Sequence, residues 1–463
     1  MRKLFWSFSV VMMALSLAAC TDEKATRTLT FMDGDEVLLS QNYVVGEALE
    51  DVQYPNLNTE GRTFFGWSDA IPNTMPDTDV TLHAVWAFSD VIDYEIVNEE
   101  VTLLAYLGLK PELVIPSTLN GYPVVAIGNA AFQDNAIVTH VTLPEGVKTI
   151  GDDAFRNSSI EHLEVPRSLL SIGNRAFQDA TSLTTVTFAQ DSQLESIGQS
   201  AFSQASALTN LHLPERLVSI GRWAFQDASG LTSIHLPGSL TSVGASPFRG
   251  ASNLVSITVD EANATFTSVN GVLFDQQMTT LLKYPEGMEL SEYTVPASVT
   301  EIGEFAFSYL DVLTTVLFAQ GSEVENIGVG AFQNARALTT IHLPASVLNI
   351  GTSAFKGATA LTTVTFAPAS QLRFINTSAF EETVSLTTLE IPPSVTTIGS
   401  HAFKGARALT SLHLSASITS LGRNAFEGAQ TLTLTAEVPS RPSGWHEDWN
   451  PLNRPVIWGY THE

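Results

Sequence analysis

The sequence predicts a β-rich solenoid, in which short strands stack as successive coils, preceded by a small β domain. The pattern Ile-Gly-x-x-Ala-Phe returns through most of the 463 residues. Its copies follow one another at steps of 22 to 25 residues, apart from one step of 59, and a fixed period in this range is typical of a solenoid. A strand-like alternation of polar and apolar residues precedes the copies. These observations predict about thirteen coils.

Nine copies of the pattern are complete, and three are degenerate. The complete copies begin at Ile127, Ile150, Ile172, Ile197, Ile220, Ile302, Ile327, Ile350 and Ile398, and the degenerate ones at Val243, Ile375 and Leu421.

The unit at residues 338–355 shows the physical reasons for the pattern. Ile341 lies between polar neighbours at a period of two, which predicts a strand with one buried face. Pro344 ends this strand, because proline cannot donate to a sheet ladder. Gly351 is expected at a backbone angle that other residues avoid, and Phe355 then returns over the core in a short turn or a single helical turn. One coil buries too few apolar groups alone, so its neighbours complete the core.

Three repeats are longer than the others. Their additional residues follow the strand, where Phe-Ala replaces Leu-Pro, in the segments 188–194, 318–324 and 366–372. Extra length in a surface loop costs little free energy, so we expect these insertions in loops outside the core.

The composition narrows the classes of partner. The chain has 22 Lys and Arg against 48 Asp and Glu, a formal net charge of -26. An acidic surface repels phosphate backbones, so we expect no nucleic-acid partner. The single cysteine, Cys20, excludes an intrachain disulfide.

The first twenty residues have the layout of a secretory signal. Two basic residues precede an apolar run at residues 4–17 that is short for a membrane span. The run ends in Leu-Ala-Ala-Cys at residues 17–20, which resembles a bacterial lipoprotein box. The resemblance implies lipidation at Cys20 and anchoring to a membrane; the alternative is an ordinary signal peptide with a chance cysteine.

Residues 29–87 differ from the array that follows. Short alternating segments separated by Gly, Asn and Pro predict a small β domain, with Trp67 and Trp86 in its core. The strand 61–67 and the segment 75–86 resemble the Listeria/Bacteroides (InlB B-type) surface repeat. The resemblance implies a compact β-grasp-like spacer.

The repeats resemble the BspA-like class of leucine-rich repeats, found on bacterial and some protist surface proteins. The similarity runs from about residue 94 to residue 429 and lacks the Asn or Cys ladder of other leucine-rich repeats. The long step fits a hairpin plus an atypical coil. The resemblance implies adhesion to a host matrix, to other bacteria or to a surface polymer.

The sequence therefore predicts five segments. These are a signal peptide at 1–20 with its lipobox at 17–20, a tether at 21–28, the β domain at 29–87, the solenoid at 88–430 with an atypical insert at 258–296, and an aromatic C-terminal cap at 431–463. Because an open solenoid end exposes its core, the last coil is expected to be covered by Trp445, Trp449, Pro455, Ile457, Trp458 and Tyr460. The alternative role for this aromatic cluster is to stack on sugars.

Stacked strands place their outward residues in two columns, which we call the strand face. The first column is His140, His162, Thr185, Asn210, Ser233, Ser256, Glu292, Thr315, Thr340, Thr363, Thr388 and Ser411. The second is Thr142, Glu164, Thr187, His212, His235, Thr258, Thr294, Leu317, His342, Thr365, Glu390 and His413. The candidate binding residues of this face are His140, His162, Glu164, Asn210, His212, His235, His342, Glu390 and His413.

Two pairs of histidines are expected on adjacent rungs, which lie about 4.8 Å apart in a sheet. His140 would face His162, with Glu164 nearby, and His212 would face His235. Such a pair suits a metal ion, but histidine also fills a polar strand position with no ligand, and spacing fixes no third ligand. We predict no metal and no cofactor on this evidence.

No motif of a catalytic site is present, neither a nucleophile elbow nor a phosphate-binding loop nor a zinc-protease helix. We therefore expect a protein that is not an enzyme. The resemblances to a lipoprotein box and to BspA-like repeats imply a lipid-anchored protein exposed at the bacterial surface, an adhesin that binds an unknown protein or glycan. A structural or variable surface antigen without a dedicated ligand is one alternative. A metal scavenger that uses the histidine rungs is another.

Overall fold

The computed structural model describes residues 25–33, 36–49, 52–55, 64–68, 71–86 and 92–460. The chain forms two compact units, residues 1–91 and 92–463. The expected signal peptide and Cys20 lie outside the described residues. Within the described ranges, no helix has the length and apolar character needed to cross a membrane.

The first unit is a four-stranded sheet in the order β2-β1-β4-β3. Its strands are β1 (Thr26–Asp33), β2 (Glu36–Val44), β3 (Phe64–Trp67) and β4 (Val80–Trp86). β1 pairs antiparallel with β2 and parallel with β4, while β3 and β4 are antiparallel. A small β unit is therefore present, and its β-grasp-like character stays a prediction.

Trp67 and Trp86 were expected to form the core of the first unit, and Trp67 does not lie at its centre. Among the described residues, the buried hydrophobic core consists of Leu29, Phe31, Leu49, Met75 and Leu82. Trp67 is only partly buried and lies against Phe31, with ring centroids 4.6 Å apart. The side chain of Trp86 lies outside the described residues. β1 begins inside the segment expected to be a tether, because residues 26–28 already pair with β2.

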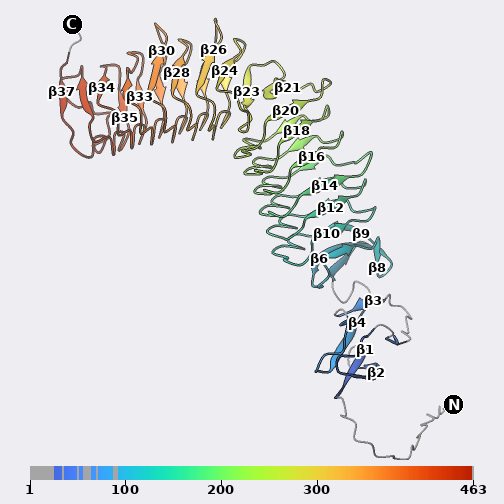
Figure 1. The fold of residues 1–463 in the computed structure, drawn as a ribbon. Coiled ribbons are helices and arrows are strands. Elements are labelled where there is room, and N and C mark those ends of the chain that lie inside the picture. The colour runs from blue at the N-terminus through green and yellow to red at the C-terminus, as the bar shows by residue number, and fades with distance from the viewer. Residues whose placement is uncertain are drawn as a thin grey trace, which may run out of the picture. The chain divides into compact units, whose positions relative to one another are not determined.

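The second unit is a β-solenoid whose coils carry two rows of parallel strands (Figure 1). The first row consists of β7 (Glu112–Val114), β10 (His140–Thr142), β12 (His162–Val165), β14 (Thr185–Phe188), β16 (Asn210–His212), β18 (Ser233–Leu236), β20 (Ser256–Val259), β24 (Glu292–Val295), β26 (Thr315–Phe318), β28 (Thr340–Leu343), β30 (Thr363–Phe366), β32 (Thr388–Leu389), β34 (Ser411–Leu414), β36 (Thr433–Ala436) and β37 (Val456–Trp458).

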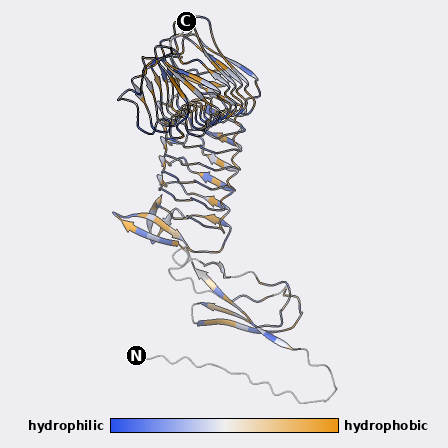
Figure 2. Cartoon of the chain, turned by 90° about the vertical axis from the view of Figure 1, so that its left-hand side faces the viewer, coloured by the Kyte–Doolittle hydropathy of each residue, from blue (hydrophilic) through white to orange (hydrophobic). Residues whose placement is uncertain are grey.

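The second row holds shorter strands, most of two residues. It consists of β6 (Glu100–Tyr106), β9 (Tyr122–Ile127), β11 (Thr149–Ile150), β13 (Ser171–Ile172), β15 (Ser196–Ile197), β17 (Ser219–Ile220), β19 (Ser242–Val243), β23 (Thr280–Lys283), β25 (Glu301–Ile302), β27 (Asn326–Ile327), β29 (Asn349–Ile350), β31 (Phe374–Ile375), β33 (Thr397–Ile398) and β35 (Ser420–Leu421). Figure 2 shows the coils stacked as regular rungs with both hydrophobic and hydrophilic residues in them.

The solenoid has about 16 turns, so the expected number of about thirteen was too low. The expectation rested on copies of Ile-Gly-x-x-Ala-Phe, and turns without this motif escaped it. Such turns lie at the N-terminal end, where β5 (Ile92–Val97) pairs with β6 and β8 (Thr118–Leu119) pairs with β9. Others lie in the insert and at β36 and β37.

The step of 59 residues contains the hairpin that the sequence predicts. β21 (Phe266–Val269) and β22 (Val272–Asp275) pair antiparallel, and β22 pairs antiparallel with β23. β23 then pairs in parallel with β25 and returns the chain to the second row.

The phenylalanine of each motif is buried and stacked on its neighbours. Phe332 and Phe355 have ring centroids 5.0 Å apart and planes at 2°, and Phe355 and Phe380 have centroids 5.1 Å apart and planes at 1°. The stack is interrupted at the insert, where Tyr284 takes the place next to Phe307. These residues lie in turns rather than in a helical turn.

The motif glycine has a role other than the expected one. Gly351 does not have a positive φ; instead, a Cβ placed on it would lie 2.7 Å from the carbonyl carbon of Gly328 in the preceding coil. The left-handed residue comes two positions later, at Ser353, with φ 57°. Asn376 stands at a glycine position, and its amide donates to the carbonyl of Ile350 at 2.9 Å. Close stacking of coils, not backbone angle, therefore explains the glycine.

Two tryptophans lie over the last full coil. Trp445 and Trp449 are 2% and 5% exposed, and the ring of Trp449 meets Phe426 edge-on at 6.0 Å. Trp445 donates its indole N–H to the carbonyl of Ile418 at 2.8 Å. Ile457 was expected to cover the core but is 51% exposed, because it points outward from β37.

Tyr460 was also expected to cover the core. It is 38% exposed and instead meets the ring of His413 edge-on, with centroids 5.7 Å apart. Pro455, also expected to cover the core, is exposed just before β37. The residues of β37 alternate inward and outward, so only part of the expected cluster is buried.

Candidate functional site

The register of the first row confirms the two columns of the strand face. His140 lies opposite His162, and His212 lies opposite His235. Glu164 lies between Thr142 and Thr187 of the neighbouring rungs. Asn210 lies on β16, the strand of His212, while the remaining candidates lie on separate rungs: His342 on β28, Glu390 just after β32, and His413 on β34.

Three histidines of the second column contact threonines on the next rung. The Nδ1 atoms of His235 and His342 lie 3.0 Å from Thr258 Oγ1 and 2.8 Å from Thr365 Oγ1. His413 Nδ1 lies 2.9 Å from Thr435 Oγ1. These contacts run along the stacking direction and link side chains of adjacent coils. These histidines fit the simpler of the two roles considered above, that of a polar strand position with no ligand, rather than that of a metal ligand.

The strand face carries three hollows with a common construction. Each is lined by the loop of a long repeat and by the shorter loop of the next coil. Their volumes are about 620, 290 and 590 Å³. The loops begin at Phe188, Phe318 and Phe366.

The far wall of each hollow is also equivalent. His212, His342 and Glu390 line the three hollows from the second column, followed two residues later by Pro214, Pro344 and Pro392. Each hollow therefore combines an aromatic ring, a polar or charged side chain and a proline. Three of the candidate residues thus share one environment on different coils. Asn210 lines a further hollow beside the first one, together with Thr185.

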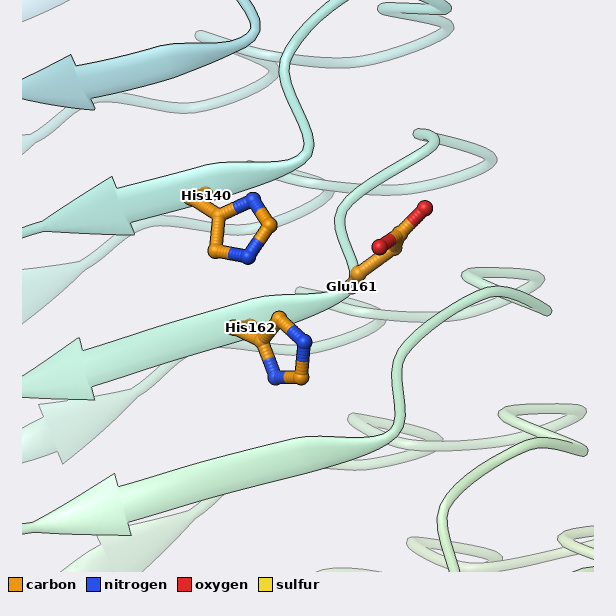
Figure 3. Close-up of side chains that lie close together, drawn as sticks. All are labelled: His140, Glu161 and His162. Carbon is orange, nitrogen blue, oxygen red and sulfur yellow. The ribbon is translucent and has the colours of Figure 1, made fainter.

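His140 and His162 form a different cluster (Figure 3). Their ring centroids lie 4.6 Å apart, and one ligand atom from each ring lies within 4.8 Å of the carboxylate of Glu161. The expected carboxylate was Glu164. That side chain instead lies beside Thr142, whose hydroxyl donates to it at 3.5 Å.

Sequence reasoning missed Glu161 because the alternation rule applies only within the strand. Glu161 immediately precedes β12, and its amide donates to the carbonyl of Thr139 at 2.7 Å. This bond fixes the backbone at the entrance of the strand. The adjacent pair Glu161-His162 was the only signal available.

The second unit is a parallel β-solenoid with an aliphatic core, one longer strand per coil and a polar strand face. These features define a leucine-rich repeat protein. A family model of the BspA type leucine-rich repeat region matches residues 112–193, 187–289, 283–408 and 373–441, more than half of the chain. The chain belongs to this family.

Solved structures show the same fold. A leucine-rich repeat protein from Eubacterium ventriosum is 25% identical, with a TM-score of 0.56 over 76% of this chain and 95% of that one. A leucine-rich cell surface protein from Faecalibacterium prausnitzii is 23% identical, with a TM-score of 0.53, over 81% and 97%. The pneumococcal vaccine antigen PcpA is 21% identical, with a TM-score of 0.54, over 80% and 98%. No curated protein matches the sequence.

Proposed function

We propose that this protein is a non-catalytic, lipid-anchored surface protein that binds a protein or glycan partner through its strand face. The observation that carries the proposal is the set of three equivalent hollows between long and short repeats. A scaffold without a ligand needs only the buried core, and loop insertions that recur at one place on one face add a binding surface to it.

The chemistry of the hollows supports a partner with polar groups around a small apolar part. Phe188, Phe318 and Phe366 are partly buried, so each exposes some ring surface. Aromatic rings beside hydrogen-bonding groups bind sugars and peptide side chains alike. The charge of -26 favours a neutral or basic partner over a polyanion.

Two further observations support display on a surface. The lipoprotein-like segment at residues 17–20 implies anchoring at Cys20. One protein of the same fold is described as a cell surface protein, and another as a vaccine antigen.

A binding array tests the proposal. Cys20→Ser protein, which cannot be lipidated, is presented to matrix proteins and glycans. Thr388→Arg places a long cation beside the third hollow, and Ser420→Arg makes the same change at an exposed position of the second row. Saturable binding that Thr388→Arg weakens at least about tenfold, with Ser420→Arg unchanged, supports the strand face; such a loss equals about 1.4 kcal/mol.

Equal effects of the two arginines would place binding elsewhere. Binding to nothing on the array would favour the structural or variable surface antigen. Cells that express the unaltered protein are treated with added protease; complete protection would contradict surface display.

A further inference from the structure

We propose that His140, Glu161 and His162 form a binding site for a divalent transition-metal ion, with Zn²⁺ the best match. The proposal stands independently of the proposed adhesive function. It rests on the geometry of the three side chains, on the hydrogen bonds behind both imidazoles and on the acidic surroundings.

The three side chains offer the right atoms at a short separation. One ligand atom from each lies within 4.8 Å of the others. Tetrahedral zinc brings ligand atoms to about 3.3 Å from one another, given bonds of about 2.0–2.1 Å. Glu161 lies at the surface, and rotation about the bonds of its long side chain can close the difference. Figure 3 shows both rings on adjacent strands with the carboxylate beside them.

A threonine hydroxyl lies beside the first ring. Thr139 Oγ1 lies 3.3 Å from the carbonyl oxygen of Pro111, to which it can donate, and 2.8 Å from His140 Nδ1. In the tautomer whose Nδ1–H donates to this hydroxyl, the lone pair of His140 is on Nε2, the atom that would bind a metal.

The second ring repeats the arrangement one coil later. Thr184 Oγ1 donates to the carbonyl of Glu161 at 3.0 Å and lies 3.4 Å from His162 Nδ1. The tautomer that donates from Nδ1 to this hydroxyl leaves the lone pair of His162 on Nε2. A metal-binding histidine characteristically donates its other N–H to an oxygen, which orients the ring and makes it a better ligand. Here the threonine hydroxyls supply both oxygens.

The surroundings of the cluster are acidic. Glu112 lies opposite His140 on the preceding rung, and Glu164 lies two residues from His162 on the same strand. Neighbouring carboxylates raise the local concentration of cations and offset the charge of the ion.

The second histidine pair provides the natural contrast. His212 and His235 occupy the same register on adjacent rungs. Among the described residues, however, His140, Glu161 and His162 are the single group of three metal-ligating side chains within reach of one another. Two imidazoles without a carboxylate give a weaker site.

The ligand set selects the ion. Two imidazoles and a carboxylate suit Zn²⁺ and its neighbours in the transition series, whereas Mg²⁺ and Ca²⁺ prefer all-oxygen sites. Three protein ligands leave the fourth position of a tetrahedral ion to water or to a donor atom of a bound partner.

Isothermal titration of the purified, tag-free Cys20→Ser protein with Zn²⁺ tests the site. We expect one ion per chain. His140→Ala and His162→Ala should each weaken binding at least a hundredfold, and Glu161→Gln about tenfold. His235→Ala, which removes an imidazole from the same face, should bind as the unaltered protein does. Because all these side chains are at the surface, we expect each variant to fold, and circular dichroism of each variant checks this.

The outcomes separate the alternatives. No heat at micromolar Zn²⁺, or affinity that His140→Ala and Glu161→Gln leave unchanged, would overturn the site. A loss in His235→Ala equal to that in His140→Ala would assign the ion to histidines in general rather than to this cluster. Competition with millimolar Mg²⁺ or Ca²⁺ should leave binding intact, and displacement by either would contradict the assignment to a transition metal.

Discussion

Gly351 lies directly against the backbone of Gly328 in the preceding coil, where an added Cβ would be 2.7 Å from the carbonyl carbon. The amide of Gly351 also donates to the carbonyl of Ile327 at 2.8 Å. The same close approach recurs at the other motif glycines, so the distance between coils depends on this row. A side chain there forces two backbones apart.

We therefore expect Gly351→Ala to lower the free energy of unfolding by about 1–3 kcal/mol, the usual cost of overpacking. Urea unfolding followed by circular dichroism measures it. Asn376 shows that one coil accommodates a larger residue, so the variant should fold.

Ser353→Gly is the matched control two residues away. Ser353 has a φ of 57°, so glycine fits its conformation and we expect a change within about 0.5 kcal/mol. Ser353→Gly removes a Cβ at a left-handed position, whereas Gly351→Ala adds one against a neighbouring backbone, so we expect the first change to be the milder. An unchanged Gly351→Ala would refute the stacking account.

The contrast between these two positions shows how far periodicity leads. A repeat predicts which residues share a row, and so the strand face and the pairing of His140 with His162 followed from the sequence. The repeat does not reveal why the same residue type recurs along a row. A glycine required by its φ angle and a glycine required by a neighbouring backbone give the same sequence pattern. The turns at both ends were undercounted because they are built without the motif.

Asp153 and Arg175 supply a prediction on pH. Arg175 donates to both carboxylate oxygens of Asp153, at 2.9 and 2.7 Å, and these bonds, chiefly, hold the pKa of Asp153 below its usual range. A carboxyl whose pKa is depressed by folding stabilises the fold above its unfolded pKa, and this stabilisation is lost as the pH falls through the folded value.

Arg175→Met should therefore lower stability at pH 7 by at most about 1 kcal/mol, because Arg175 is partly exposed and screened by solvent. The difference from the unaltered protein should shrink below about pH 4, near the ordinary pKa of an aspartate. Thermal unfolding at pH 7 and pH 3 measures both. Arg336→Met removes one positive charge from an exposed site as the control. A difference that stays constant with pH would contradict the pairing.

Lys283 and Glu286 form a buried ion pair beside the hairpin insert, with Nζ 2.7 Å from Oε1 and side chains 4% and 1% exposed. The same oxygen accepts the amide N–H of Gly250 at 2.9 Å, which joins the coil before the hairpin to the one after it. Removing one member of a buried pair leaves an uncompensated charge.

Lys283→Met should cost about 3–5 kcal/mol. Adding Glu286→Gln should recover part of this loss, because the amide oxygen still accepts from Gly250 and no buried charge remains. The double-mutant cycle in urea gives the coupling energy. A double variant no more stable than Lys283→Met would show that the charge pairing is not what holds this junction.

The site was less predictable than the fold for a related reason. The strand alternation placed His140 and His162 on one face, but Glu161 lies at the strand entrance, where alternation stops applying. The three hollows depend on the order of long and short repeats. The length of each loop was visible in the sequence, but the hollow between a long loop and the next short loop is seen only when the coils are stacked in the structure.

Trp449 leads to a prediction on how the solenoid ends. Its ring meets Phe426 edge-on at 6.0 Å and is 5% exposed, so it closes the row of stacked phenylalanines. Trp449→Ala should cost about 3–5 kcal/mol locally. Because each coil of a solenoid is stabilised mainly by its neighbours, the loss should be confined to the last coils. Hydrogen exchange should then quicken at β33, β35 and β36 and stay unchanged at β11 to β17.

The control is Leu452→Ala, at a position 60% exposed, which should leave the exchange rate of every segment as it was. Faster exchange along the whole array would mean that the solenoid unfolds as one cooperative unit and that its end is not an independent cap.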